Sequence, residues 1–174
     1  MKKNYNMFLR LALSMVAVFG VTNAFAKWEK VYDLTATYAC HVTKSGNILL
    51  SDYQYMDYSG GIYISEDQGA TWTKTNVQDF CYSQFIEAEG YVFAGGEGCV
   101  IARSADEGKT WEGMNFGYAY SDFLSEDEIR YNPCYAMAYH KGKLYAADFN
   151  GGGVVYSEDL GETWTLADRE SLMY

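Results

Sequence analysis

The pattern Ser-x-Asp-x-Gly-x-Thr-Trp occurs three times in this 174-residue chain, and it constrains the fold more than any other feature. The copies occupy Ser65–Trp72, Ser104–Trp111 and Ser157–Trp164, with all five fixed positions intact in each. Self-similarity of this kind indicates a repeated supersecondary unit that packs against its own neighbours. The repeat therefore predicts an array of similar units over most of the chain after residue 27.

The residue types of the pattern are those of a tight connection between two antiparallel strands. The short Ser and Asp side chains can hydrogen-bond the backbone of the turn, and the Gly permits a positive φ. The Thr begins the next strand, and the Trp is expected to insert its ring between neighbouring sheets. No copy supplies the alternating acidic ligands and distal Glu of an EF-hand loop. We therefore expect the pattern to be scaffold.

The three copies resemble the Asp box, or bacterial neuraminidase repeat, of sialidase-like β-propellers. That family includes sialidases, xyloglucanase-type hydrolases, sortilin-like receptors and a photosystem assembly factor. The resemblance therefore implies an architecture and leaves the activity open. In the family the box lies on the side of the propeller away from the usual binding face. The residues assigned to these structural boxes are Ser65, Asp67, Gly69, Thr71, Trp72, Ser104, Asp106, Gly108, Thr110, Trp111, Ser157, Asp159, Gly161, Thr163 and Trp164.

Aligned on the boxes, each unit predicts four short strands rich in Val, Ile, Tyr, Phe and Thr. The inner strands are expected at Tyr38–Thr43, Cys81–Ala88 and Cys134–His140, and the second strands at Ile48–Asp52, Tyr91–Gly95 and Lys143–Asp148. The third strands are expected at Gly61–Ser65, Cys99–Ser104 and Gly153–Ser157, and each fourth strand follows a box. The predicted fold is an all-β propeller of four-stranded antiparallel blades. About three blades are present, at about 36–76, 77–115 and 132–168.

The spacing of the boxes locates an insertion. Boxes that begin at residues 65, 104 and 157 are 39 and 53 residues apart, and the shorter interval fits one four-stranded blade. The difference of 14 residues is assigned to a loop insertion at 113–133, which contains the acidic run Glu126-Asp127-Glu128 and the only proline, Pro133.

The number of blades predicts an incomplete ring. Trp28 starts Trp28–Tyr32, which matches a fourth strand without a box and is interpreted as the outer strand of a closing blade. Propellers need at least about four blades, so three blades and one strand leave the ring open. We interpret the chain as the N-terminal part of a longer protein whose further blades follow. The alternative is a small protein that closes by self-association.

The N-terminus predicts export. Lys2 and Lys3 precede an apolar run over residues 7–21, and Ala24-Phe25-Ala26 is a small-x-small cleavage site. Residues 1–26 are therefore interpreted as a signal peptide, and the mature chain 27–174 as periplasmic, cell-surface or secreted. An uncleaved anchor is the alternative, but Arg10 interrupts the run. No other segment is expected to span a membrane.

Charge and cysteines limit the partners. Loss of Lys2, Lys3 and Arg10 changes the formal charge from −10 to −13 in 27–174, which argues against nucleic acid and anionic membranes. The four cysteines permit disulfides in an exported protein, and their pairing stays open. Burial as small apolar residues, with one bridge at most, is the favoured interpretation. The four are Cys40, Cys81, Cys99 and Cys134.

The candidate ligand-binding residues are aromatic and acidic side chains on the face opposite the boxes. Flat rings beside carboxylates suit sugar recognition, because rings cover C–H faces and carboxylates accept hydroxyl protons. The mature chain is therefore expected to bind glycan, or another exported protein as an assembly scaffold. The candidates are Tyr53, Tyr55, Asp57, Tyr58, Glu97, Tyr118, Tyr120, Asp122, Arg130, Asp148 and Asn150.

A glycoside hydrolase with part of its catalytic set outside this chain is the alternative. Sialidases of the family carry three substrate-binding arginines and a Phe/Tyr-Arg-Ile-Pro motif, which is absent here. Arg103 adjoins a box, so it is expected on the face away from the binding face. Asp57, Asp122 and Asp148 are candidate carboxylates for such chemistry, but hydrolysis requires a defined separation between two of them. No catalytic residue, metal ligand or cofactor is predicted, and structural or solvated roles are favoured for both histidines, His41 and His140.

Overall fold

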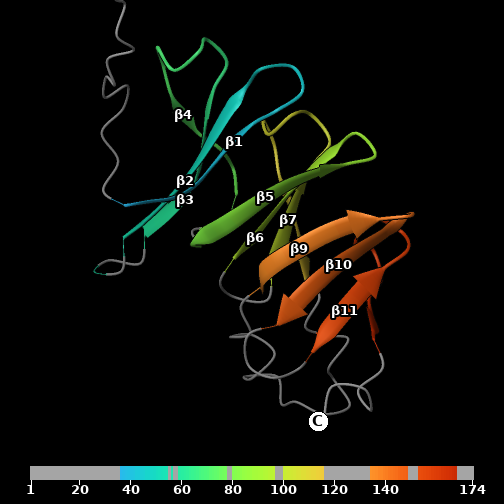
Figure 1. Cartoon of the computed structure of the whole chain (residues 1–174). Helices are drawn as coiled ribbons and strands as arrows, with labels where there is room; N and C mark the ends of the chain where they lie inside the picture. Colours follow the sequence, from blue (N-terminus) through green and yellow to red (C-terminus); the bar gives the residue numbers. More distant parts are fainter. Residues whose placement is uncertain are drawn as a thin grey trace, which may run out of the picture. The chain divides into compact units, whose positions relative to one another are not determined.

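The computed structural model describes residues 36–54, 56, 59–77, 80–96, 100–115, 134–148 and 153–167. These residues form twelve strands in three open four-stranded sheets, with no helix among them (Figure 1). The all-β prediction and the four-stranded antiparallel blades are thereby confirmed. The predicted signal peptide at 1–26, the predicted strand at 28–32 and most of the predicted insertion at 113–133 lie outside the described residues.

Each sheet follows the chain order of its strands, and we call the three sheets the first, second and third blade. The first blade comprises β1 (Thr37–Val42), β2 (Ile48–Gln54), β3 (Ser59–Ser65) and β4 (Thr73–Lys74). The second comprises β5 (Tyr82–Ala88), β6 (Tyr91–Gly96), β7 (Val100–Ser104) and β8 (Glu112–Asn115). The third comprises β9 (Cys134–His140), β10 (Lys143–Asp148), β11 (Val154–Ser157) and β12 (Thr165–Leu166). In every blade the box connects the third strand to the fourth.

The register of the strands is the same in each blade. The residue before the box serine pairs with a residue of the second strand, and this pair defines equivalent positions across the blades. The pairs are Leu49 with Ile64, Phe93 with Arg103, and Tyr145 with Tyr156. Since side chains alternate between the two faces of a strand, every other residue can be matched from these pairs.

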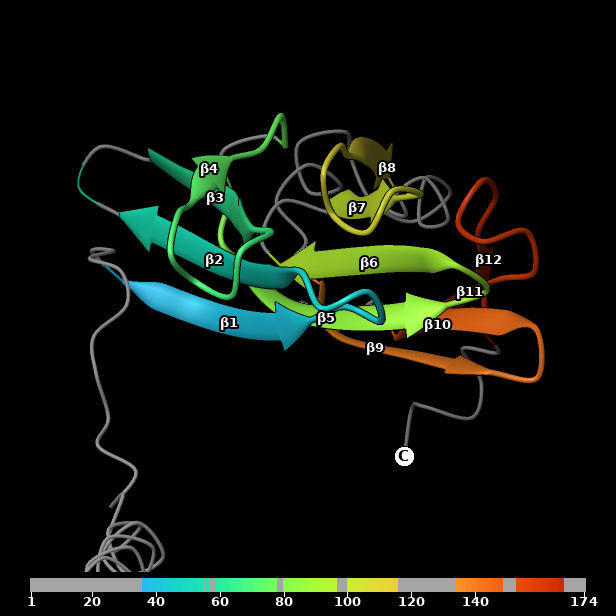
Figure 2. The ribbon, with the colours of Figure 1, turned by 90° about the horizontal axis from the view of Figure 1, so that it is seen from above.

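Apolar side chains pack between successive blades. One cluster joins Leu49 and Ile62 of the first blade to Val92 and Ala102 of the second. A second cluster joins other residues of the second blade, such as Phe93, to the third. Strand β1 contacts β5, and β5 contacts β9, so these first strands lie along one side of the blades (Figure 2). The second blade is therefore apolar on both faces, as expected for stacked sheets.

Side-chain amides also connect the blades. The side chain of Asn76 donates to the carbonyl of Trp111 (3.0 Å) and accepts from its N–H (2.8 Å). Gln84 does the same with Met137, donating to the carbonyl (3.0 Å) and accepting from the N–H (2.7 Å). Such two-point pairing satisfies backbone groups of one blade from its neighbour, and it fixes their relative register.

The interpretation of the cysteines as buried small residues is wrong for one of them. Cys81 and Cys134 are buried, whereas Cys40 is an exposed free thiol on β1. The reason is its face of the strand, because Cys40 alternates with His41, whose ring packs toward the second blade. Cys99 lies outside the described residues, so the disulfide pairing stays a prediction.

Candidate functional site

The polar groups of each box hydrogen-bond one another. In the second box, Ser104 Oγ accepts from the N–H of Gly108 (2.9 Å) and donates to Asp106 Oδ1 (2.8 Å). Asp106 then accepts from the N–H (2.8 Å) and the hydroxyl (2.7 Å) of Thr110, and Trp111 Nε1 donates to the carbonyl of Gly108 (2.9 Å). The same five bonds recur in the other two boxes. The boxes are therefore structural turns, as the residue types indicate.

Two consecutive residues of every box have left-handed backbone geometry. The glycines at the fifth position have φ of 91°, 90° and 99°, as the sequence predicts. The residue before each glycine also has a positive φ, and these residues are Gln68 (62°), Glu107 (60°) and Leu160 (58°). Sequence reasoning missed this second position because three different residue types occupy it. The hydrogen bonds that recur in each box offset the backbone strain at this fourth position.

The second and third boxes also contact the preceding blade. A Cβ added to Gly108 would lie 2.5 Å from Leu49 Cδ2, so this glycine presses directly on the first blade. Asn47 Nδ2 of the first blade donates to the carbonyl of Glu107 (3.2 Å). At the next junction, Arg103 Nη1 of the second blade donates to the carbonyl of Leu160 (2.9 Å). In both junctions the carbonyl at the fourth box position accepts a side-chain donor from the blade before.

Arg103 is a structural residue that the sequence did not reveal. Its buried guanidinium contacts Glu112 of its own blade (2.6 Å) and Glu162 of the third box (2.7 Å), and it covers the ring of Tyr91. These contacts account for every side of the group, so Arg103 holds two blades together. Its place beside a box, away from the predicted binding face, agrees with the sequence interpretation.

The box carboxylates are more acidic than usual. The hydrogen bonds from the Thr71 hydroxyl and N–H, with that from Ser65, lower the pKa of Asp67 from 3.8 to about 2. For Asp106 and Asp159, burial is the largest influence and raises the pKa, but the hydrogen bonds within the box together outweigh it and leave the pKa lowered. All three groups are therefore held as carboxylates down to acid pH.

Lowering the pH should destabilise the fold by protonating these box carboxylates. The pKa of each of these carboxyl groups is lower in the folded protein than in the unfolded chain. Each group therefore stabilises the fold fully above its unfolded pKa, and this stabilisation is lost as the pH falls through the folded pKa. We expect the urea midpoint to fall as the pH is lowered from about 4 to about 2, the window set by Asp67. Asp67→Asn should lower the midpoint at neutral pH and make its pH dependence shallower. Parallel curves for the variant and the wild type would contradict this assignment.

The end of the blades opposite the boxes differs from the box end. In each blade, the pairing of the first strand with the second has a register irregularity at this end. The irregularities lie between Thr37 and Ala39, between Tyr82 and Gln84, and between Ala147 and Asp148. Bulges of this kind redirect side chains and often occur next to binding sites. Asp52 is also at this end, where its buried carboxylate accepts the N–H of Ala36 (2.7 Å).

Most of the predicted ligand-binding residues lie outside the described residues. These are Tyr55, Asp57, Tyr58, Glu97, Tyr118, Tyr120, Asp122, Arg130 and Asn150. Asp148 ends β10, at the end opposite the boxes, and pairs with Cys134. Tyr53 is at the same end, but only 5% of it is exposed, so its ring offers little surface to a ligand. Among the described residues, no group of three acidic, His or Cys side chains could hold a metal ion. In these same ranges, no helix is long and apolar enough to cross a membrane.

The family comparison agrees with this geometry. The model of the BNR/Asp-box repeat matches residues 63–74, which contain the first box and the ends of the strands beside it. The first box is similar to an Asp-box repeat. No curated protein matches the chain significantly. A solved structure described as YCF48 bound to D1 peptide is similar to it at 15% identity, with a TM-score of 0.47. That similarity covers 82% of this chain and 44% of the solved one, so the chain spans less than half the length of that relative.

Proposed function

We propose that this chain is an exported, non-enzymatic binding module that recognises glycan at the end of its blades opposite the Asp boxes. The observation that carries the proposal is the difference between the two ends. At the box end, the repeated pattern of polar side chains is engaged in its own turn, as in Asp67 with Thr71. At the other end, all three blades have irregular strand pairing. A rigid scaffold with variable loops at one end is the usual arrangement of a binding protein.

The residue types support glycan as the ligand class. The sequence predicts tyrosines and carboxylates in the loops at that end, including Tyr55 and Asp57 after β2, and Tyr118 and Asp122 in the predicted insertion. Aromatic rings and carboxylates together bind the two chemical surfaces of a sugar, its C–H faces and its hydroxyls. The negative charge of the mature chain favours neutral or cationic glycans over anionic ones.

The proposal can be tested with mature chain 27–174 on an array of neutral, cationic and anionic polysaccharides, followed by titration calorimetry on the best ligand. We expect binding without release of sugar, and a several-fold loss of affinity in Tyr55→Ala combined with Asp57→Ala. Tyr139→Ala is the matched control, because this tyrosine lies near the box end, where its hydroxyl donates to Glu89. Release of sugar would favour the hydrolase alternative, and folded protein that binds no glycan would contradict the proposal.

A further inference from the structure

The fourth position of the box contacts the preceding blade in both junctions between the described blades. Glu107 occupies it in the second box and Leu160 in the third, with φ of 60° and 58°. The carbonyl of each residue accepts a donor from the preceding blade, namely Asn47 Nδ2 and Arg103 Nη1 respectively. Because the backbone sets the direction of the Cα–Cβ bond, the two side chains leave the box in the same direction. One is acidic and the other apolar, although the fixed positions of the box are identical.

Glu107 contacts the turn between β1 and β2 of the first blade. We call the turn between the first and second strands of a blade its inner turn. Glu107 Oε2 accepts the N–H (3.1 Å) and the hydroxyl (2.9 Å) of Ser45, in the middle of this turn. Hydrogen bonding to Thr43 and Ser45, together with the charge of Lys44, lowers the pKa of Glu107. The inner turn of the first blade therefore favours a carboxylate at the fourth box position.

The residues that flank the inner turn are polar in the first blade and apolar in the second. In the first blade the N–H of Thr43 donates to the carbonyl of Asn47 (2.8 Å), and both residues are buried. The strand register makes this pair equivalent to Ala88 and Tyr91 in the second blade. Ala88 is buried, and Tyr91 packs against the apolar cluster that joins the second and third blades.

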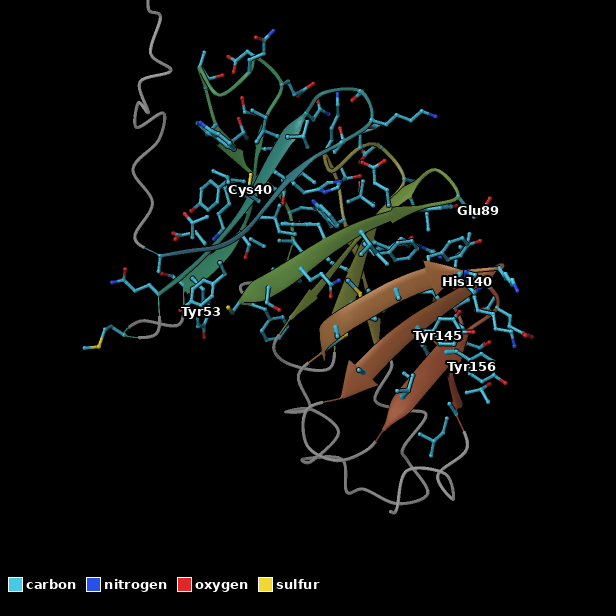
Figure 3. All side chains as sticks on the ribbon, in the orientation of Figure 1. Cys40, Tyr53, Glu89, His140, Tyr145 and Tyr156 are labelled. Carbon is cyan, nitrogen blue, oxygen red and sulfur yellow. The ribbon has the colours of Figure 1, made fainter. Side chains whose placement is uncertain are left out.

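Leu160 lies against an apolar surface at the second junction. It is partly buried and packs against the same cluster as Ala88 and Tyr91. The inner turn of the second blade is Glu89-Gly90, so it offers no serine and brings a carboxylate (Figure 3). A carboxylate at position 160 would lose water beside apolar groups and approach a residue of the same charge. Leucine at this position avoids both costs.

We propose that the side chain at the fourth box position recognises the inner turn of the preceding blade and so determines which blade can pack there. Glu107 fits the polar inner turn of the first blade, and Leu160 fits the apolar inner turn of the second. Blades that share one turn sequence could otherwise pack in the wrong order, which is a characteristic failure of repeat proteins. The proposal concerns the packing of the blades and does not depend on the proposed function.

Urea unfolding of the chain with exchanged fourth-position residues tests the proposal. We expect Glu107→Leu and Leu160→Glu each to lower the urea midpoint. Backbone strain cannot explain the loss, because each residue type already occurs at this φ in the other box. Glu158→Leu is the matched control, since it removes a box carboxylate whose exposed ion pair with Lys143 lies within one blade. The shift in Glu107→Leu should be at least twice that of the control, and a shift no larger than the control's would overturn the proposal.

A double-mutant cycle separates recognition of the inner turn from a general loss of stability. Ser45→Ala and Glu107→Leu remove the same contact, so their combined effect on the free energy of unfolding should be smaller than the sum of the two. Ser45→Ala and Glu158→Leu should be additive. Ser45 and Glu107 lie at the surface, so we expect the variants of this cycle to fold. Additive effects of Ser45→Ala and Glu107→Leu would overturn the proposal.

Charge reversal at the second inner turn tests the specificity itself. Glu89→Lys gives this turn a cation, as Lys44 does in the first blade, and lysine suits the backbone because Lys141 has nearly the same φ as Glu89 (48° and 49°). Leu160→Glu should therefore lower the urea midpoint less in the Glu89→Lys background than in the wild type. The hydrogen bond from Tyr139 to Glu89 is absent from both Glu89→Lys variants, so it does not affect this comparison. Equal losses in the two backgrounds would overturn the proposal.

Discussion

Replacement of Trp111 by alanine is expected to lower the free energy of unfolding by about 3–5 kcal/mol, as other large-to-small core changes do. Only 7% of Trp111 is exposed, and its ring packs in the cluster between the first and second blades, tilted against Phe85. The substitution would also leave the carbonyl of Gly108 without its indole donor. Urea unfolding followed by circular dichroism would measure the change.

The controls for Trp111 come from the same chain. Trp72 makes the same hydrogen bond in the first box (3.1 Å) but is only half-buried, so Trp72→Ala should cost clearly less. Met56→Ala should have almost no effect, because Met56 is exposed. If Trp111→Ala shifted the urea midpoint no further than Met56→Ala, the ring could not be packing between blades.

Most of the fold could be predicted because the box repeats. Three copies of one turn fix the positions of the third and fourth strands, and the intervals between them accommodate two further strands. The predicted inner strand at Cys134–His140 and second strand at Lys143–Asp148 match β9 and β10 in their bounds. Such accuracy depends on local hydrogen bonds, which a short sequence pattern specifies completely.

Contacts between blades were harder to predict, because they join residues far apart in the sequence. The guanidinium of Arg103 contacts Glu162, 59 residues away, and no local pattern indicates this pair. Cys40 is expected to be buried as a small apolar residue, but its exposure depends on whether another sheet covers that face of its strand. The sequence specifies which residues share a face, and it does not specify what lies against them.

The candidate site is the least predictable part. Aromatic and acidic residues in loops indicate a possible ligand, but the depth of each side chain depends on strand register. Tyr53 illustrates this, since its partner across β2 and β3 is Gly60, and a Cβ at that glycine would collide with the carbonyl of Asp52. The tyrosine ring therefore packs over the glycine and is almost completely buried.

Replacement of Gly108 by alanine is the second large expected effect, at about 2–5 kcal/mol. The positive φ of 90° is unfavourable for a residue with a Cβ, which costs about 1–2 kcal/mol. Overpacking against Leu49 adds about 1–3 kcal/mol, because the new methyl group would lie 2.5 Å from its Cδ2. Lys109→Ala should be nearly silent, since it removes only an exposed ion pair with Glu66.

Comparison of Gly108→Ala with Gly90→Ala tests most directly the central claim that the second box is a turn that presses on the preceding blade. Gly90 has a φ of 85° and also follows a residue with positive φ, but nothing lies within 4 Å of a Cβ placed there. The two variants therefore share the backbone strain, and only Gly108→Ala meets the first blade. We expect Gly108→Ala to lower the free energy of unfolding by about 1–3 kcal/mol more than Gly90→Ala. Equal losses for the two variants would contradict the claim.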